Sequence, residues 1–155
     1  MSAITPAAKS RAPAASAPRI LEAGIALFAV VYLSQALVMV ISPHSFYKSI
    51  GGFDSYNPHY LRDVASFSAA IGVGLGVSLW RPSWRVPALA ITTVQYALHS
   101  VNHLFDIDIA HPQWTGYFDF FSLAAATLVL VWLLRTAIAR ERAPAGPHDR
   151  KELSQ

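Results

Sequence analysis

The hydrophobic positions of the chain gather in four long segments separated by shorter polar stretches. The segments span roughly 20–42, 60–80, 86–105 and 117–136. A helix needs about 20 mostly apolar residues to cross the hydrocarbon core of a bilayer, and each segment is close to that length. The pattern therefore predicts an all-α protein, a bundle of four transmembrane helices within residues 19–136.

The stretches outside these segments have a different character. Residues 1–18 are rich in alanine, proline and serine, and residues 137–155 are rich in charged residues, alanine and proline. Such composition is typical of disordered tails. The connection 43–59 contains Asn57-Pro58, which signals a helix N-cap followed by proline at the first helical position. We expect this loop to lie on the membrane surface or to cap the bundle.

Composition agrees with a membrane protein. Hydrophobic residues make up 54% of the chain and charged residues 14%, whereas about 25% charged residues is usual in soluble domains. The net charge of +3 is modest and the basic residues sit at the ends and in one turn, so no nucleic-acid partner is predicted. The absence of cysteine excludes disulfides, thiolate metal sites and iron–sulfur clusters.

Lysine and arginine are placed unevenly along the chain. Of the twelve, only Lys48 and Arg62 lie near the connection between the first two segments, while the others lie in the tails, beside them or in the turn 81–85. Basic residues concentrate on the cytoplasmic side, so we predict a multi-pass plasma-membrane protein with both termini cytoplasmic. The aromatic residues expected at the two membrane interfaces are Trp80 and Trp84 inside and Trp114 and Tyr117 outside.

A polar stripe interrupts the third apolar segment. At about 100° per residue, its members share one arc of a helix, with Thr92 on the same arc; they are Gln95, His99, Asn102, His103 and Asp106. An ionisable residue at the bilayer centre costs roughly 2.5–3.5 kcal/mol on insertion scales. We therefore expect the stripe to face the bundle interior, in the outer half of the membrane.

Other helices carry polar residues that the topology places at the same depth. His59, Arg62 and Asp63 begin the second segment and Asp119 begins the fourth. Asp63 and Asp119 are the predicted partners of the stripe, and Arg62 next to Asp63 suggests a structural ion pair.

Three interpretations of the stripe differ in chemistry. His99 and His103 have the i, i+4 spacing that lets two imidazoles coordinate one ion, and Asp63 and Asp119 would complete a set suited to zinc, iron or manganese. The second interpretation is a hydrogen-bond network that holds the helices in register. The third is a ligand, quinone or proton site, which intramembrane ionisable groups commonly mark. A bound divalent metal, haem or quinone therefore stays open.

Small residues recur in the second segment. Ser68, Gly72 and Gly76 follow the small-xxx-small spacing that lets helices approach closely, and Gly74 lies between them. We expect them to serve packing. A nucleotide loop is excluded because this stretch lies inside an apolar helix with no strand before it.

Two stretches carry a family resemblance. "NPHYLRDVASFSAAIGVGLG" at 57–76 and "ALHSVNHLFD" at 97–106 resemble small bacterial four-helix membrane proteins of the broad DoxX-like kind. The resemblance implies a compact four-helix bundle in the cytoplasmic membrane. Some DoxX-like proteins are linked to quinone-coupled redox chemistry or to larger membrane complexes. It carries over no catalytic residue to this chain.

Three functions are compatible with these patterns. The first is an accessory or small-ligand-binding membrane protein with a buried His/Asp site. The second is an outward-facing metal- or quinone-dependent redox protein using His99, His103, Asp63 and Asp119. The third is an oligomeric transporter or proton-conducting element. Whether the protein is an enzyme stays open, and the expected partners are the lipid bilayer and a homo-oligomer or larger membrane complex.

Overall fold

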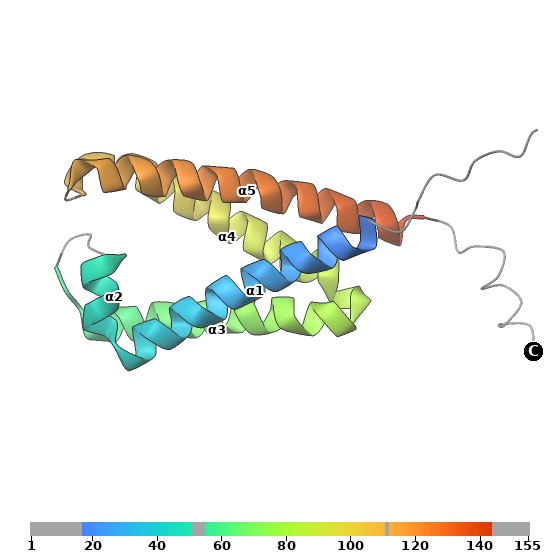
Figure 1. The fold of residues 1–155 in the computed structure, drawn as a ribbon, viewed down its shortest axis with the longest axis horizontal. Helices are drawn as coiled ribbons and strands as arrows, with labels where there is room; N and C mark the ends of the chain where they lie inside the picture. The colour runs from blue at the N-terminus through green and yellow to red at the C-terminus, as the bar shows by residue number, and fades with distance from the viewer. Residues whose placement is uncertain (1–16, 51–54, 111, 144–155) are drawn as a thin grey trace, which may run out of the picture.

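The computed structural model describes residues 17–50, 55–110 and 112–143, and these residues are almost entirely helical. In chain order the elements are α1 (Ala17–Ile41), α2 (Pro43–Ser49), α3 (Pro58–Trp80), η1 (Pro82–Trp84), α4 (Arg85–Phe105), η2 (Ile107–Ile109) and α5 (Gln113–Glu141). Successive long helices run in opposite directions along the bundle (Figure 1). The predicted all-α class is confirmed.

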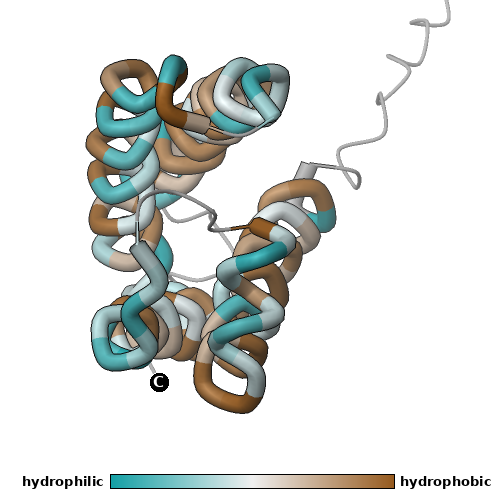
Figure 2. The backbone as a smooth tube through the Cα atoms, turned by 90° about the vertical axis from the view of Figure 1, so that its left-hand side faces the viewer, coloured by the Kyte–Doolittle hydropathy of each residue, from teal (hydrophilic) through white to brown (hydrophobic). Residues whose placement is uncertain are grey.

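Three helices of the described chain are long and apolar enough to cross a membrane. They are α1 from Arg19, α3 and α5, with mean hydropathies of 2.3, 1.4 and 1.9. The helix α4 is of similar length but carries the polar stripe, which lowers its mean hydropathy. The chain is thus a helical protein with three span-capable helices, and Figure 2 shows hydrophobic stretches along the tubes with hydrophilic positions among them.

Local signals fix several helix ends. The Asn57 side chain accepts hydrogen bonds from the backbone N–H groups of His59 (3.1 Å) and Tyr60 (3.2 Å), so the predicted N-cap of α3 is confirmed. The short helix α2 was not predicted from the sequence. The helix α1 begins at Ala17 and α5 continues to Glu141, so residues 17–18 and 137–141 of the predicted tails are helical. Residues 142 and 143 follow α5, and the rest of both predicted tails lies outside the described residues.

The four long helices form two pairs. One pair is α1 with α3, and the other is α4 with α5. Gly72 of α3 allows the two helices of the first pair to approach closely, because a Cβ at this position would lie only 2.8 Å from Leu33 Cγ of α1. Gly76, one turn later, has nothing within 4 Å of such a Cβ. The small-residue prediction therefore holds at Gly72 and is wrong at Gly76.

The pairs meet at the end of the bundle that carries both described termini, which we call the closed end (Figure 1). Its core joins all four long helices, including Ile25, Leu75, Leu89 and Leu130, each with 0% of its surface exposed. A Cβ at Gly24 of α1 would lie 2.7 Å from Leu133 Cδ2 of α5. Glycine thus allows α1 to approach the second pair here.

A polar clamp reinforces the closed end. The Arg85 guanidinium lies 2.9 Å from the Glu22 carboxylate of α1. It also donates hydrogen bonds to the carbonyl oxygens of Ser78 (3.2 Å) and Leu79 (3.3 Å) in the last turn of α3. One side chain of α4 therefore ties together three helices and satisfies carbonyls at a helix end.

The opposite end, which we call the open end, is packed differently. Here α2 packs through Phe46 and Tyr47 onto a second core made only of α1 and α3 residues: Ala36, Met39, Leu61 and Ala65. Among the residues that the structure describes, the α4–α5 pair contributes none to that core. In Figure 1 the two pairs diverge towards this end, with α2 lying against the first pair.

Candidate functional site

A cleft of about 620 Å³ lies between the two helix pairs towards the open end. Its lining comes from α1, α2, α3, α4 and α5 and from the ends of the connections between them. The cleft exists because the closed-end core joins all four long helices whereas the open-end core joins only the first pair and α2. Its volume falls within the roughly 300–1,000 Å³ range of small-molecule sites.

The polar stripe of α4 lines this cleft along its whole length. The side chains are those named from the sequence: Gln95, His99, Asn102, His103 and Asp106. Thr92, on the same arc, is fully buried below the cleft and donates to the carbonyl oxygen of Ala88 (2.8 Å). Helical periodicity predicted from the sequence that these residues share one face of the helix. In the structure that face lines the cleft.

Asp119 of α5 lies on the same wall, across the tight α4–α5 connection. A Cβ at Gly116 would clash with the carbonyl oxygen of Ile107, so only glycine permits this approach of α5 to η2. The connection runs from Asp106 to Pro112, and Asp119 lies in the second turn of α5. Both carboxylates therefore line one cleft.

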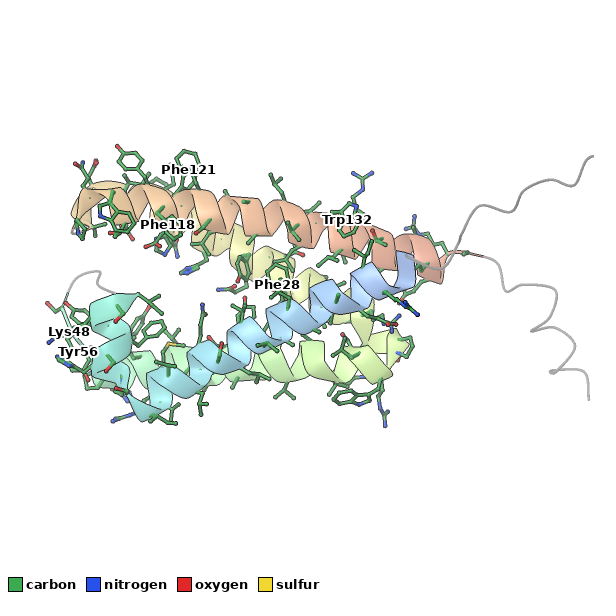
Figure 3. The ribbon with its side chains drawn as sticks, in the orientation of Figure 1. Phe28, Lys48, Tyr56, Phe118, Phe121 and Trp132 are labelled. Atoms are coloured by element: carbon green, nitrogen blue, oxygen red, sulfur yellow. The ribbon has the colours of Figure 1, made fainter. Side chains whose placement is uncertain are left out.

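The floor of the cleft links the two pairs. The Tyr32 hydroxyl of α1 donates a hydrogen bond to Gln95 Oε1 of α4. The Tyr96 ring lies edge-on to Phe28, with centroids 5.5 Å apart, and to Tyr32, with centroids 5.7 Å apart. Figure 3 shows Phe28 where α1 crosses the second pair, and Phe118 and Phe121 on α5 nearer the open end.

Tyr32 and Tyr96 were not named as site residues from the sequence. The signal for Tyr32 was its place in the middle of an apolar helix, away from the membrane interfaces where tyrosine is usual. A buried tyrosine hydroxyl needs a hydrogen-bond partner, and Gln95 supplies it.

The wall opposite the stripe is largely apolar and aromatic, with Gln35 of α1 and Ser68 of α3 as polar members. It includes Met39 of α1, Phe46 and Tyr47 of α2, and Tyr60, Phe67 and Ile71 of α3. Next to it, the Tyr56 ring lies 5.3 Å from the centroids of both His44 and Tyr47. The cleft thus has a polar face and an aromatic face.

Three predicted site residues of α3 lie elsewhere. His59, Arg62 and Asp63 are exposed and do not line the cleft. His59 Nε2 lies 3.5 Å from the Asp63 carboxylate, and both side chains are more than half exposed. Within the described chain, the partner of Asp63 is therefore His59, and not the expected Arg62. The rotation of α3 turns these residues away from the stripe.

The predicted metal ligands are not brought together as a set. The His99 and His103 rings are adjacent, with centroids 4.7 Å apart and an interplanar angle of 87°. Asp63 lies on the outside of α3. Among residues 17–50, 55–110 and 112–143, no three His, Cys, Asp or Glu side chains are grouped to hold a metal ion.

The arrangement suits binding. Imidazole, amide and carboxylate groups on one wall can exchange hydrogen bonds with a polar group, while the aromatic wall can bury an apolar body. The chain matches no protein-family model, no curated protein and no solved structure. The resemblance to DoxX-like proteins therefore rests on the two sequence stretches alone.

Proposed function

We propose that this chain is a small integral membrane protein that binds a small amphiphilic ligand in the cleft between its helix pairs, in the outer half of the bilayer. The observation that carries the proposal is the cleft itself, with the polar stripe of α4 on one wall and aromatic side chains on the other. Ligand sites in membrane bundles commonly combine intramembrane polar groups with an apolar surround.

We propose that α4 is the fourth transmembrane helix. It lies along α5 and turns its polar face to the cleft. The other face presents Ile91, Val94, Leu98 and Val101, which are between 46% and 62% exposed. A helix with an apolar outer face and a polar inner face can cross a membrane despite a lower mean hydropathy, because only the outer face meets lipid.

We propose that the closed end is cytoplasmic and the open end faces outward, in the cytoplasmic membrane. Arg81, Arg85, Arg140 and Arg142 lie at the closed end, whereas Lys48 and Arg62 lie at the open end, as the positive-inside rule requires. Exposed aromatic residues at both ends agree with this placement, because tryptophan and tyrosine are common at membrane interfaces. They are Trp80 and Trp84 at the closed end and Trp114 and Tyr117 at the open end.

The exposed apolar surface of α1 and α5, including Leu27, Val30 and Leu128, would meet lipid. The same surface could also meet a second copy of the chain or another subunit of a larger membrane complex.

Two serines provide a matched test of the binding site. Ser122 lines the cleft, whereas Ser66 does not. Both are exposed, and each hydroxyl donates to the backbone carbonyl three residues earlier, at 3.0 Å and 2.7 Å. Ser122→Trp should fill the cleft, and Ser66→Trp should leave it open.

The measurement is native mass spectrometry of each protein extracted with its own lipids into nanodiscs. Wild type and Ser66→Trp should release the same bound small molecule, and Ser122→Trp should lose it. The same bound molecules in all three proteins, or none in wild type, would contradict a ligand site in the cleft.

A further inference from the structure

The charged groups that line the cleft are of one sign. Asp106 and Asp119 both line it, and no lysine or arginine does so among the described residues. Lys48 and Arg62, the basic residues of the open end, are exposed and lie outside the lining. An anionic ligand would therefore meet two carboxylates and no permanently charged cation of the described chain.

The two imidazoles of the wall do not reverse this preference. His99 and His103 line the cleft beside the carboxylates, and their rings lie edge to face at 4.7 Å. A neutral imidazole offers one nitrogen as a hydrogen-bond acceptor. Two positive charges on adjacent rings would repel each other. One protonated ring would still leave two carboxylates against one positive charge in the cleft.

The facing wall is rich in aromatic rings. Phe46 and Tyr47 of α2 and Tyr60 and Phe67 of α3 all line the cleft. The face of an aromatic ring attracts a cation, by about 0.5–1 kcal/mol at exposed sites and about 2 kcal/mol or more where water is excluded. A cation in the cleft would thus have carboxylates on one side and aromatic rings on the other.

We infer that the cleft takes an amphiphilic organic cation, with its charge between Asp106, Asp119 and the aromatic wall and its apolar body directed towards Tyr32 and Tyr96. This inference rests on the proposed ligand-binding function and names the chemical class of its ligand. The volume of about 620 Å³ accommodates a cation with a bulky apolar body.

Two probes of matched size and shape and opposite charge test the inference. Tetraphenylphosphonium and tetraphenylborate differ chiefly in the sign of their charge. Binding of each is measured by equilibrium dialysis to the full chain in zwitterionic nanodiscs, with empty nanodiscs as the baseline for lipid partitioning. We expect saturable, protein-dependent binding of tetraphenylphosphonium and none of tetraphenylborate.

Single substitutions locate the charge. Asp119→Asn and Asp106→Asn should each weaken tetraphenylphosphonium binding about tenfold, because each removes one carboxylate from the wall. Asp63→Asn should leave binding unchanged, because that carboxylate lies outside the cleft. Thermal unfolding of each variant in the same nanodiscs separates lost binding from lost folding, and the two independent aspartate variants keep the test usable if one fails to fold.

Three outcomes would overturn the inference. They are saturable tetraphenylborate binding as strong as that of the cation, the absence of saturable binding of both probes, and undiminished cation binding by the folded aspartate variants. None of them removes the proposed function, which the tryptophan pair at 122 and 66 tests separately. Loss of the native ligand from Ser122→Trp together with any of these outcomes would indicate a ligand site of another chemical class.

Discussion

The two ends of the bundle use the same four helices and pack them differently. At the closed end, residues of all four long helices share one core, and Arg85 ties α4 to α1 and α3. At the open end, α1 and α3 pack with α2 while α4 and α5 stand apart across the cleft. The two ends therefore differ in role. The closed end holds the four helices together, and the open end contains the cleft.

The largest effect is expected from truncating the shared core. Leu130→Ala should destabilise the bundle by about 2–4 kcal/mol, because a fully buried leucine leaves a cavity behind. Leu128→Ala, on the same helix and 71% exposed, should change stability by less than about 0.5 kcal/mol. Reversible unfolding in mixed micelles measures both. Equal costs would mean that the closed end has no distinct core.

The next effect concerns the clamp. Arg85→Gln should cost about 2 kcal/mol, because a charged donor is lost from the Glu22 carboxylate and from two backbone carbonyls. The same unfolding assay should find Asp63→Asn nearly neutral, within about 0.5 kcal/mol, because its pair with His59 is exposed. A larger loss of unfolding free energy from Asp63→Asn than from Arg85→Gln would show that the Arg85 clamp does not stabilise the closed end.

A smaller effect on stability is expected from replacing two glycines of α3 by alanine. Gly72→Ala forces the new methyl group against Leu33, and overpacking commonly costs about 1–3 kcal/mol. The better helix propensity of alanine offsets up to about 1 kcal/mol, so a net loss near 1 kcal/mol is expected. Gly76→Ala meets open space and should be neutral or stabilising. Stabilisation by both substitutions would show that α1 and α3 are not closely packed at Gly72.

Features set by neighbours in the sequence could be predicted. Asn57-Pro58 begins α3 because an asparagine side chain can reach N–H groups two and three residues away. The stripe of α4 follows from helical periodicity alone. The short helix α2 was missed, although Ser42-Pro43 resembles a helix start, because seven residues carry too little periodic pattern to distinguish a helix from a loop.

Features set by rotation and pairing could not be predicted. Asp63 and Asp119 both lie near the start of an apolar helix, yet Asp119 lines the cleft and Asp63 faces outward. Which face of α3 turns inward depends on its close approach to α1 at Gly72, and no single sequence reports that contact. The separation of α4–α5 from α1–α3 at one end likewise depends on contacts between distant residues.

We propose that the stripe of α4 faces a cleft that opens outward and not the lipid. The chain has no cysteine, so single cysteines can be introduced and treated in intact cells with a membrane-impermeant maleimide, which reacts with thiols exposed to water. The stripe positions are Gln95, His99, Asn102 and His103, and the opposite-face controls are Ile91, Val94, Leu98 and Val101. Ser83→Cys, in the exposed turn of the closed end, serves as the cytoplasmic control.

We predict labelling at the stripe positions, strongest towards His103 and weaker towards Gln95 at the floor. The apolar positions should stay unlabelled, and Ser83→Cys should react only after the cells are permeabilised. Labelling without helical periodicity or on the apolar face would contradict a stripe that lines the cleft, and reaction of Ser83→Cys in intact cells would contradict a cytoplasmic closed end.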